Sequence, residues 1–183
     1  GFIHGDYEAM DLDAEGERPY LDRLDALCTV SEGCKAALDR VFPEQKAKHH
    51  LIYNILSADM LEKLARQEGG FDDGFEGKKI LTIARLSPQK GLDMGMQAIS
   101  LLKNQGIDFR WYIIGKGPEY QKLKGLMGEK GLQGRVVFLG ERSNPYPYFK
   151  QCDLYFQPSR FEGKAIAVDE AIFFRKPILL ANF

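Results

Sequence analysis

Seven apolar runs rich in strand-forming residues alternate with amphipathic stretches of helical length, and this alternation constrains the fold more than any other feature. The predicted strands are residues 26–30, 51–53, 79–84, 109–114, 135–139, 154–157 and 177–181. Two blocks within them, 80–84 and 111–114, are nearly continuous in apolar residues, which is typical of strands covered by helices on both faces. Short connections between the runs predict an α/β fold, with a doubly wound parallel sheet in a three-layer α/β/α arrangement.

Four helices are predicted from capping and periodicity. Ser31 is a good N-cap for a helix over residues 32–41. Apolar side chains recur at helical spacing over residues 92–102, and residues 120–127 follow a proline that suits a first helical turn. Residues 163–174 are apolar almost all round, which predicts a buried helix.

The composition changes at residues 67–77, where four glycines and four acidic residues fall within eleven positions. Such a stretch is typical of a surface connector. We therefore divide the chain into a remnant of a preceding domain (1–55), a crossover and linker (56–77), and an α/β domain truncated at its C-terminus (78–183). The chain has no initiator Met and stops just after a predicted strand, so we expect both ends to be cut.

The formal net charge of −1 gives no overall attraction to nucleic acid or anionic lipid, so an anion site must be a local cluster of basic side chains. Cys28, Cys34 and Cys152 are an odd, widely spaced set, which favours three reduced thiols in a cytosolic protein over a disulfide framework. No His, Asp or Cys cluster has metal-ligand spacing. No apolar run approaches the roughly 18 residues of a membrane span, and the N-terminus lacks the features of a signal peptide.

Two glutamates, Glu162 and Glu170, flank a predicted strand-to-helix turn. They lie roughly 10–12 Å apart along the chain, too far to share a proton but suited to two ends of one elongated ligand. The residues that would present free backbone N–H groups at the helix N-terminus, where phosphate binds, are Gly163, Lys164, Ala165 and Ile166. Glu170 stands in an otherwise apolar helix, so its carboxylate needs a partner or a ligand. The alternative is two solvated glutamates, one at a cap and one on an exposed face.

A second charged cluster follows the predicted strand of residues 79–84. Arg85 stands at the carboxyl end of that strand, where open α/β sheets bind ligands, and Lys90 comes just before the next helix. A guanidinium and an ammonium that converge on one crevice suit a diphosphate. Two solvated loop cations are the alternative.

Two further strand ends carry glycine turns. Gly115 opens a Gly-x-Gly turn that lacks the third glycine of a dinucleotide fingerprint, and a tight turn explains it equally. Gly140, Glu141 and Arg142 follow the strand of residues 135–139, at a position where backbone groups would face a base.

Taken in order, these motifs resemble the C-terminal donor-binding domain of retaining family 4 glycosyltransferases, which have the GT-B fold. The motifs are Ala84-Arg-Leu-Ser-Pro-Gln-Lys-Gly91, Gly115-Lys-Gly-Pro118, Phe138-Leu-Gly140 and Pro158-Ser-x-x-Glu-x7-Glu170. The resemblance covers residues 78–183 closely. It is looser over residues 1–55, which look like the end of the N-terminal, Rossmann-like acceptor-side domain.

The resemblance implies a hexosyltransferase that moves a sugar from a nucleoside diphosphate sugar to a saccharide or lipid-linked acceptor, with retention of configuration and without a metal or other cofactor. It implies polysaccharide biosynthesis in the cytoplasm, at the inner face of a membrane if the full-length protein associates peripherally with one, and no nucleic-acid partner. This chain would be a donor-binding fragment and inactive alone. A non-catalytic nucleotide-sugar-binding module and another GT-B enzyme, such as a nucleotide-sugar epimerase, are the alternatives.

Site roles follow from the same resemblance. Arg85 and Lys90 would hold the donor diphosphate, and Glu170 would accept hydrogen bonds from the ribose. The residues implied to surround the sugar, phosphate and base are Glu162 and His4 as catalytic residues, Gly163, Lys164, Ala165 and Ile166 as backbone donors, and Gly115, Gly140, Glu141 and Arg142. His4 belongs to a brief motif, so a plain polar residue at a cut end is the alternative. Lys164 departs from the family, in which the residue two after the first glutamate is often aromatic.

Overall fold

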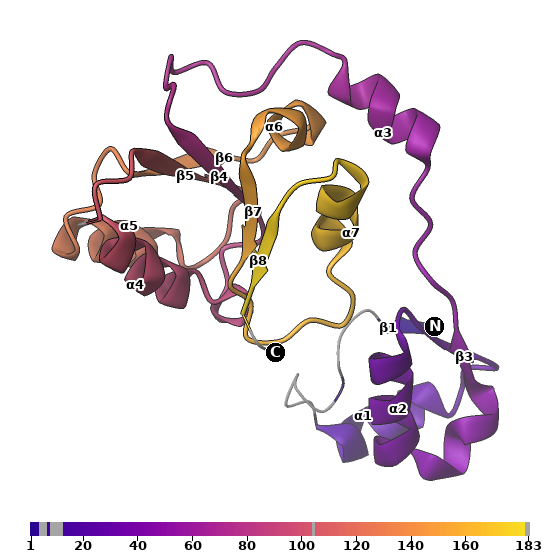
Figure 1. Ribbon diagram of the computed structural model, residues 1–183. Coiled ribbons are helices and arrows are strands. Elements are labelled where there is room, and N and C mark those ends of the chain that lie inside the picture. The colour runs from indigo at the N-terminus through magenta and orange to yellow at the C-terminus, as the bar shows by residue number, and fades with distance from the viewer. Residues whose placement is uncertain (4–6, 8–12, 104, 182–183) are drawn as a thin grey trace. The chain divides into compact units, whose positions relative to one another are not determined.

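The computed structural model describes residues 1–3, 7, 13–103 and 105–181. The chain divides into two compact units, one of residues 1–55 with 161–166 and the other of residues 56–160 with 167–183. Both are α/β in character (Figure 1).

The first unit contains a three-stranded parallel sheet in the order β1-β2-β3. Its elements are β1 (Phe2–Ile3), α1 (Ala14–Leu21), β2 (Leu27–Thr29), α2 (Glu32–Val41), the 3-10 helix η1 (Pro43–Lys48) and β3 (His49–Leu51). The Ser31 hydroxyl accepts a hydrogen bond from the Cys34 N–H at 3.2 Å, so the predicted N-cap of α2 is confirmed. Leu38 and Phe42 are fully buried in the core of this unit.

The second unit contains a five-stranded, all-parallel sheet in the order β6-β5-β4-β7-β8. Its elements are α3 (Ala58–Ala65), β4 (Lys78–Ile83), the 3-10 helix η2 (Pro88–Lys90), α4 (Leu92–Leu102), β5 (Phe109–Ile114), α5 (Tyr120–Glu129), β6 (Val136–Gly140), α6 (Tyr146–Gln151), β7 (Leu154–Gln157), α7 (Ile166–Phe173) and β8 (Ile178–Leu180). The strand order runs outward from β4 in both directions, as in doubly wound sheets. The predicted α/β fold is confirmed.

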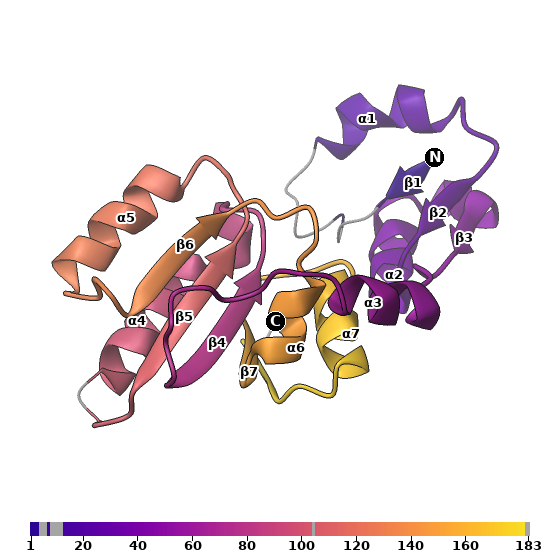
Figure 2. The same cartoon turned by 90° about the horizontal axis from the view of Figure 1, so that it is seen from above.

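Helices α4 and α5 cover one face of this sheet, and α6 and α7 cover the other (Figure 1 and Figure 2). Successive strand residues point to opposite faces. Ile80 and Trp111 therefore belong to one buried cluster, whereas Leu81 and Tyr112 belong to the other. Two-sided burial explains why these strands are apolar without alternation.

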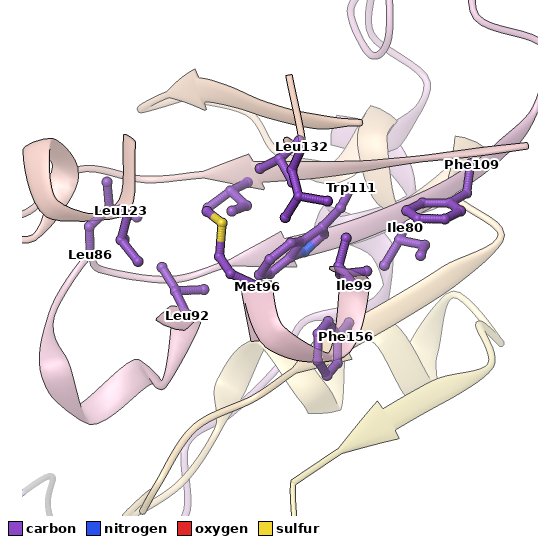
Figure 3. Close-up of a cluster of buried hydrophobic side chains, with 12 residues drawn as sticks. Ile80, Leu86, Leu92, Met96, Ile99, Phe109, Trp111, Leu123, Leu132 and Phe156 are labelled. Atoms are coloured by element: carbon purple, nitrogen blue, oxygen red, sulfur yellow. The ribbon is translucent and has the colours of Figure 1, made fainter. Parts of the chain in front are cut away.

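Trp111 lies at the centre of the first cluster, with Met96 and Ile99 of α4 beside it (Figure 3). The helix approaches the indole so closely that a Cβ at Gly95 would stand 2.6 Å from the ring. The indole N–H donates to the Thr82 hydroxyl at 2.8 Å, so the polar atom of this buried ring has a partner.

The connector of residues 56–77 is hydrogen-bonded to the rest of the second unit at several points. Asn144 donates from its amide to the carbonyl of Leu64 at 2.8 Å, and the side chain of Gln151 accepts from the N–H of Phe71 at 2.9 Å. Further along, the Asp73 carboxylate pairs with Arg110 at 2.7 Å. The acidic, glycine-rich stretch is thus tied to helix α6 and to strand β5.

The prediction for the last helix is wrong in two respects. Helix α7 begins at Ile166 rather than near Gly163, because glycine is a poor helix former and the N–H of Ile166 donates to the carbonyl of Lys164 instead. The helix is also not buried all round. Ile172 is 59% exposed and Ala171 is the buried residue of the helix, since only one side of a helix can pack on β7 and β8.

Candidate functional site

A cavity of about 1070 Å³ lies where β4, β5 and β6 end. Its lining comes from three strand ends and the loops that follow them: Ile83, Ala84, Arg85, Ile114, Gly115, Lys116, Gly117, Glu141, Arg142 and Ser143. The carboxyl edge of a parallel sheet is the general position of ligand sites in open α/β folds. The volume of this cavity is slightly above the range of roughly 300–1,000 Å³ that is usual for small-molecule pockets.

The Gly-x-Gly turn after β5 lines the cavity and packs against the loop that follows β4. Gly115 has φ 139°, and a Cβ there would collide with the carbonyl of Ala84. A Cβ at Gly117 would likewise collide with the backbone of Leu86, whose N–H donates to the carbonyl of Lys116 at 2.9 Å. The two glycines therefore let the β5 turn lie directly on the chain that carries Arg85.

Charge in this cavity is predominantly positive. Arg85, Lys116 and Arg142 bring three cations, and Glu141 brings one carboxylate, paired with Lys116 at 2.6 Å. A hydrogen bond restrains the Arg142 side chain, since its Nε donates to the hydroxyl of Tyr148 at 2.9 Å. Two guanidinium groups that line one cavity, Arg85 and Arg142, offer planar, permanently charged donors suited to phosphate oxygens.

Gly140 lies beside this cavity rather than in it. It lines a neighbouring space of about 490 Å³ together with Lys116, Tyr120 and Phe138. The rings of Tyr120 and Phe138 meet edge to face at 5.4 Å, so this space has an aromatic wall. Both spaces share the turn that begins at Gly115.

Lys90 does not line either cavity, but its loop is firmly held. Arg160 makes a bidentate pair with Asp93, with distances of 2.9 and 2.7 Å, and donates to the carbonyl of Pro88 at 2.6 Å. The guanidinium is the first cause of a lowered pKa at Asp93. Gly91, at φ 58°, allows this loop to approach the carbonyl of Pro158, where a Cβ would collide. The loops that follow β4 and β7 are therefore joined at a fixed distance.

Glu170 lies on α7, half-buried, and its Oε1 accepts a hydrogen bond from the hydroxyl of Tyr146 at 3.0 Å. Burial raises the pKa of the Glu170 carboxyl, and the hydroxyl of Tyr146 opposes this by stabilising the ionised form. The expectation that this carboxylate needs a partner in an apolar helix is thus met by a tyrosine that the sequence did not single out.

The remaining candidates lie in the loop between β7 and α7. Glu162, Gly163, Lys164 and Ala165 fall, with Ile166, in the segment 161–166 that groups with the first unit, and none of them lines either cavity. The N–H of Ile166 is used within the loop, so the prediction of four free N–H groups is wrong at that residue. His4 lies outside the described residues.

A buried polar chain supports the start of that loop. The hydroxyl of Tyr155 donates to Gln157 at 2.6 Å, and the Gln157 amide donates to the hydroxyl of Ser159 at 2.8 Å. Ser159 is fully buried, so the turn after β7 is anchored by side chains as well as by backbone. The sequence analysis did not predict the Tyr155–Gln157–Ser159 hydrogen bonds, Tyr146 or Lys116. Of these, only Lys116 had a sequence signal, its place between two glycines of the turn.

Across residues 1–3, 7, 13–103 and 105–181, no group of three or more His, Cys, Asp or Glu side chains could hold a metal ion. Among the helices described, none is long and apolar enough to cross a bilayer.

Several known proteins resemble this chain. It is 27% identical over 150 residues to N-acetylgalactosamine-N,N'-diacetylbacillosaminyl-diphospho-undecaprenol 4-alpha-N-acetylgalactosaminyltransferase of Campylobacter jejuni, a match that covers 82% of this chain and 39% of the relative. It is 31% identical over 139 residues to the O-antigen biosynthesis glycosyltransferase WclY of Escherichia coli, covering 74% and 38%. The chain therefore spans about two fifths of the length of these curated relatives.

A solved structure, that of Anabaena Alr3699/HepE in complex with UDP and glucose, superposes with a TM-score of 0.82 at 21% identity, covering 99% of this chain and 52% of that one. The fold is thus the Rossmann-like α/β fold of GT-B glycosyltransferases. The family model described as glycosyl transferases group 1 matches residues 65–183, which include every residue that lines the cavity. The chain belongs to the group 1 glycosyltransferase family.

Proposed function

We propose that the full-length protein is a retaining glycosyltransferase of family 4 that moves a hexose from a nucleoside diphosphate sugar to a saccharide or lipid-linked acceptor. The observation that carries the proposal is the positively charged cavity at the carboxyl ends of β4, β5 and β6 in a group 1 family member. In support, the Anabaena relative was solved with UDP and glucose, and the Campylobacter relative is named for a diphospho-undecaprenol-linked acceptor.

Binding of the donor is the part of the reaction that this chain's own residues explain. Arg85 and Arg142 offer planar, permanently charged donors to the diphosphate, and Lys116 adds a point charge at the rim. Lys90, on the loop fixed by Arg160, is assigned to the same phosphates from the α4 side. Glu170 is assigned to the ribose hydroxyls, and Glu162 and His4 to the donor sugar.

Departure of the nucleoside diphosphate is the step that these cations would accelerate. Negative charge builds on the leaving phosphate oxygens as the glycosidic bond breaks, and preorganised donors stabilise it without reorganisation. Positive side chains can do this without a metal, and we propose that none is required. We place the reaction in the cytoplasm, in polysaccharide assembly at the inner face of the membrane.

Nucleotide binding by this chain tests the proposal. Calorimetry with UDP, GDP and ADP should show binding to at least one of them. Arg85→Ala should weaken that binding by about 1.5–3 kcal/mol, the range for a charge-assisted hydrogen bond. Lys124→Ala is the matched control, because Lys124 is an exposed cation on α5 outside the cavity. Equal affinity for wild type and Arg85→Ala would contradict the proposal.

A further inference from the structure

Glu170 is held by one specific contact between two helices. The Tyr146 hydroxyl, at the start of α6, donates to Oε1 of Glu170 on α7 at 3.0 Å. Both side chains are half-buried. Within the described part of the chain, the other carboxylate oxygen, Oε2, makes no hydrogen bond.

The ring of Tyr146 cannot easily turn away from this contact. Its centroid lies 6.4 Å from that of the Phe149 ring and 6.1 Å from that of the Phe174 ring. Such aromatic contacts favour the observed orientation of the ring. The hydroxyl is therefore presented at a defined position, and the carboxylate that bonds to it takes a defined orientation.

The backbone of Tyr146 is anchored as well, through Asn144. The Tyr146 N–H donates to the Asn144 side-chain oxygen at 3.2 Å. The same Asn144 side chain donates from its nitrogen to the carbonyl of Leu64 at 2.8 Å and to the Gln67 side chain at 2.9 Å. Leu64 is in the last turn of α3 and Gln67 follows the helix, so a path of hydrogen bonds runs from α3 through Asn144 and Tyr146 to Glu170.

A carboxylate that binds a vicinal diol must be ionised and must point at least one free oxygen to the hydroxyls. Burial works against the first requirement at Glu170. A tyrosine donor on one oxygen meets both requirements, since it stabilises the charge and leaves the second oxygen for the ligand. Asp169, the neighbouring acid, opposes ionisation, which makes the contribution of the hydroxyl more important.

We propose that Tyr146 is a positioning residue, which holds Glu170 so that Oε2 accepts a hydrogen bond from a ribose hydroxyl, and that Asn144 ties this arrangement to the connector helix α3. The inference rests on the proposed function, because the ribose is that of the donor nucleotide. Tyr146 itself does not contact the ligand; its effect is exerted through Glu170.

The experiment compares a nucleoside diphosphate with its 2′,3′-dideoxy analogue in wild type and Tyr146→Phe. This variant keeps the ring and removes only the hydroxyl. Affinity for the ribonucleotide should fall by about 2- to 10-fold, the effect of one lost hydrogen bond, whereas affinity for the dideoxy analogue should change less than about twofold. Tyr112→Phe is the matched control, because it removes a similar bond, from Tyr112 to Asp73 at 2.8 Å, at the connector.

A double-mutant cycle separates positioning from a general structural effect. If Tyr146 acts through Glu170, then Tyr146→Phe should cost no further affinity in a Glu170→Gln background. Equal losses for both nucleotides, or full additivity with Glu170→Gln, would overturn the proposal. Should Tyr146→Phe not fold, Asn144→Ala tests the same path and should show the same selectivity in weaker form.

A second readout needs no nucleotide. In the ligand-free chain, the carboxyl of Glu170 followed by NMR should titrate at a higher pH in Tyr146→Phe than in wild type, because a donor to the ionised form is lost. An unchanged midpoint would overturn the positioning role. If wild type binds no nucleotide at all, the proposed function fails, and this titration alone still decides whether Tyr146 controls Glu170.

Discussion

Arg175 occupies a backbone position that favours glycine. Its φ is 53°, the only positive φ of a non-glycine residue in the described part of the chain. It ends α7: its N–H donates to the carbonyl of Ile172 at 2.9 Å, and the N–H of Lys176 donates to that of Ala171 at 3.0 Å. These two bonds define a Schellman motif, in which the residue after the C-cap takes the left-handed conformation.

The change in the free energy of unfolding on Arg175→Gly follows from two opposing contributions. The left-handed conformation costs a residue with a Cβ about 1–2 kcal/mol. Glycine loses more chain entropy on folding, which costs about 0.5–1 kcal/mol. No hydrogen bond or ion pair of the Arg175 side chain is found among the described residues, so no such interaction is lost. We therefore expect a net stabilisation of roughly 0–1.5 kcal/mol, with a middle value of about 0.75 kcal/mol.

Urea unfolding of wild type, Arg175→Gly and Arg175→Ala measures this difference. Alanine removes the guanidinium but keeps the Cβ, so Arg175→Ala should gain little. An increase in the unfolding midpoint for glycine alone supports the backbone argument. If alanine stabilises as much as glycine, the arginine side chain is the source of the effect and the reasoning is refuted.

Two further predictions concern the titration of carboxylates. Because burial raises the pKa of Glu170, its ionised form destabilises the fold at neutral pH. Glu170→Gln should therefore raise the thermal unfolding midpoint at pH 7 while weakening ribonucleotide binding. A lower unfolding midpoint would contradict this. Because Arg160 lowers the pKa of Asp93, that pair stabilises the fold above the ordinary value of 3.8 and stops doing so as pH falls through the lowered value. The difference in unfolding free energy between wild type and Arg160→Ala should therefore shrink from pH 7 to pH 3, and a constant difference would refute it.

Much of the fold is predictable because burial on two faces leaves a strong signal. Strands β5 and β7 and helix α4 have the predicted bounds, since continuous apolar runs and clear periodicity mark them. Helices α1 and α6 were not predicted. Pro19 lies inside the first, and the second is only six residues long with Pro145 before it and Pro147 within it, so local propensity argues against both. Packing in the folded chain overrides that preference.

The candidate site also contains residues that the sequence predicts and residues that it does not. Arg85 and Arg142 follow strands, so their place at the carboxyl edge of the sheet follows from topology alone. The contact of Tyr146 with Glu170 joins residues 24 positions apart on two helices, and it depends on how α6 and α7 pack. Sequence periodicity reports which side of a helix is apolar. It does not report which polar atoms meet across a helix pair.

Donor binding and sugar transfer should be separable in this chain, and we expect the first without the second. Every residue that lines the cavity belongs to the second unit, and the chain spans 39% of the length of the Campylobacter relative. Transfer requires donor and acceptor to be held in near-attack geometry, which contributes several orders of magnitude in rate. With donor contacts from one unit, we expect nucleotide affinity of roughly 10 μM to millimolar. Release of nucleoside diphosphate is followed with nucleotide sugars and a panel of saccharide acceptors, with Arg85→Ala as the background control. Acceptor-dependent release above that background would show that the cavity and its surrounding loops suffice for transfer.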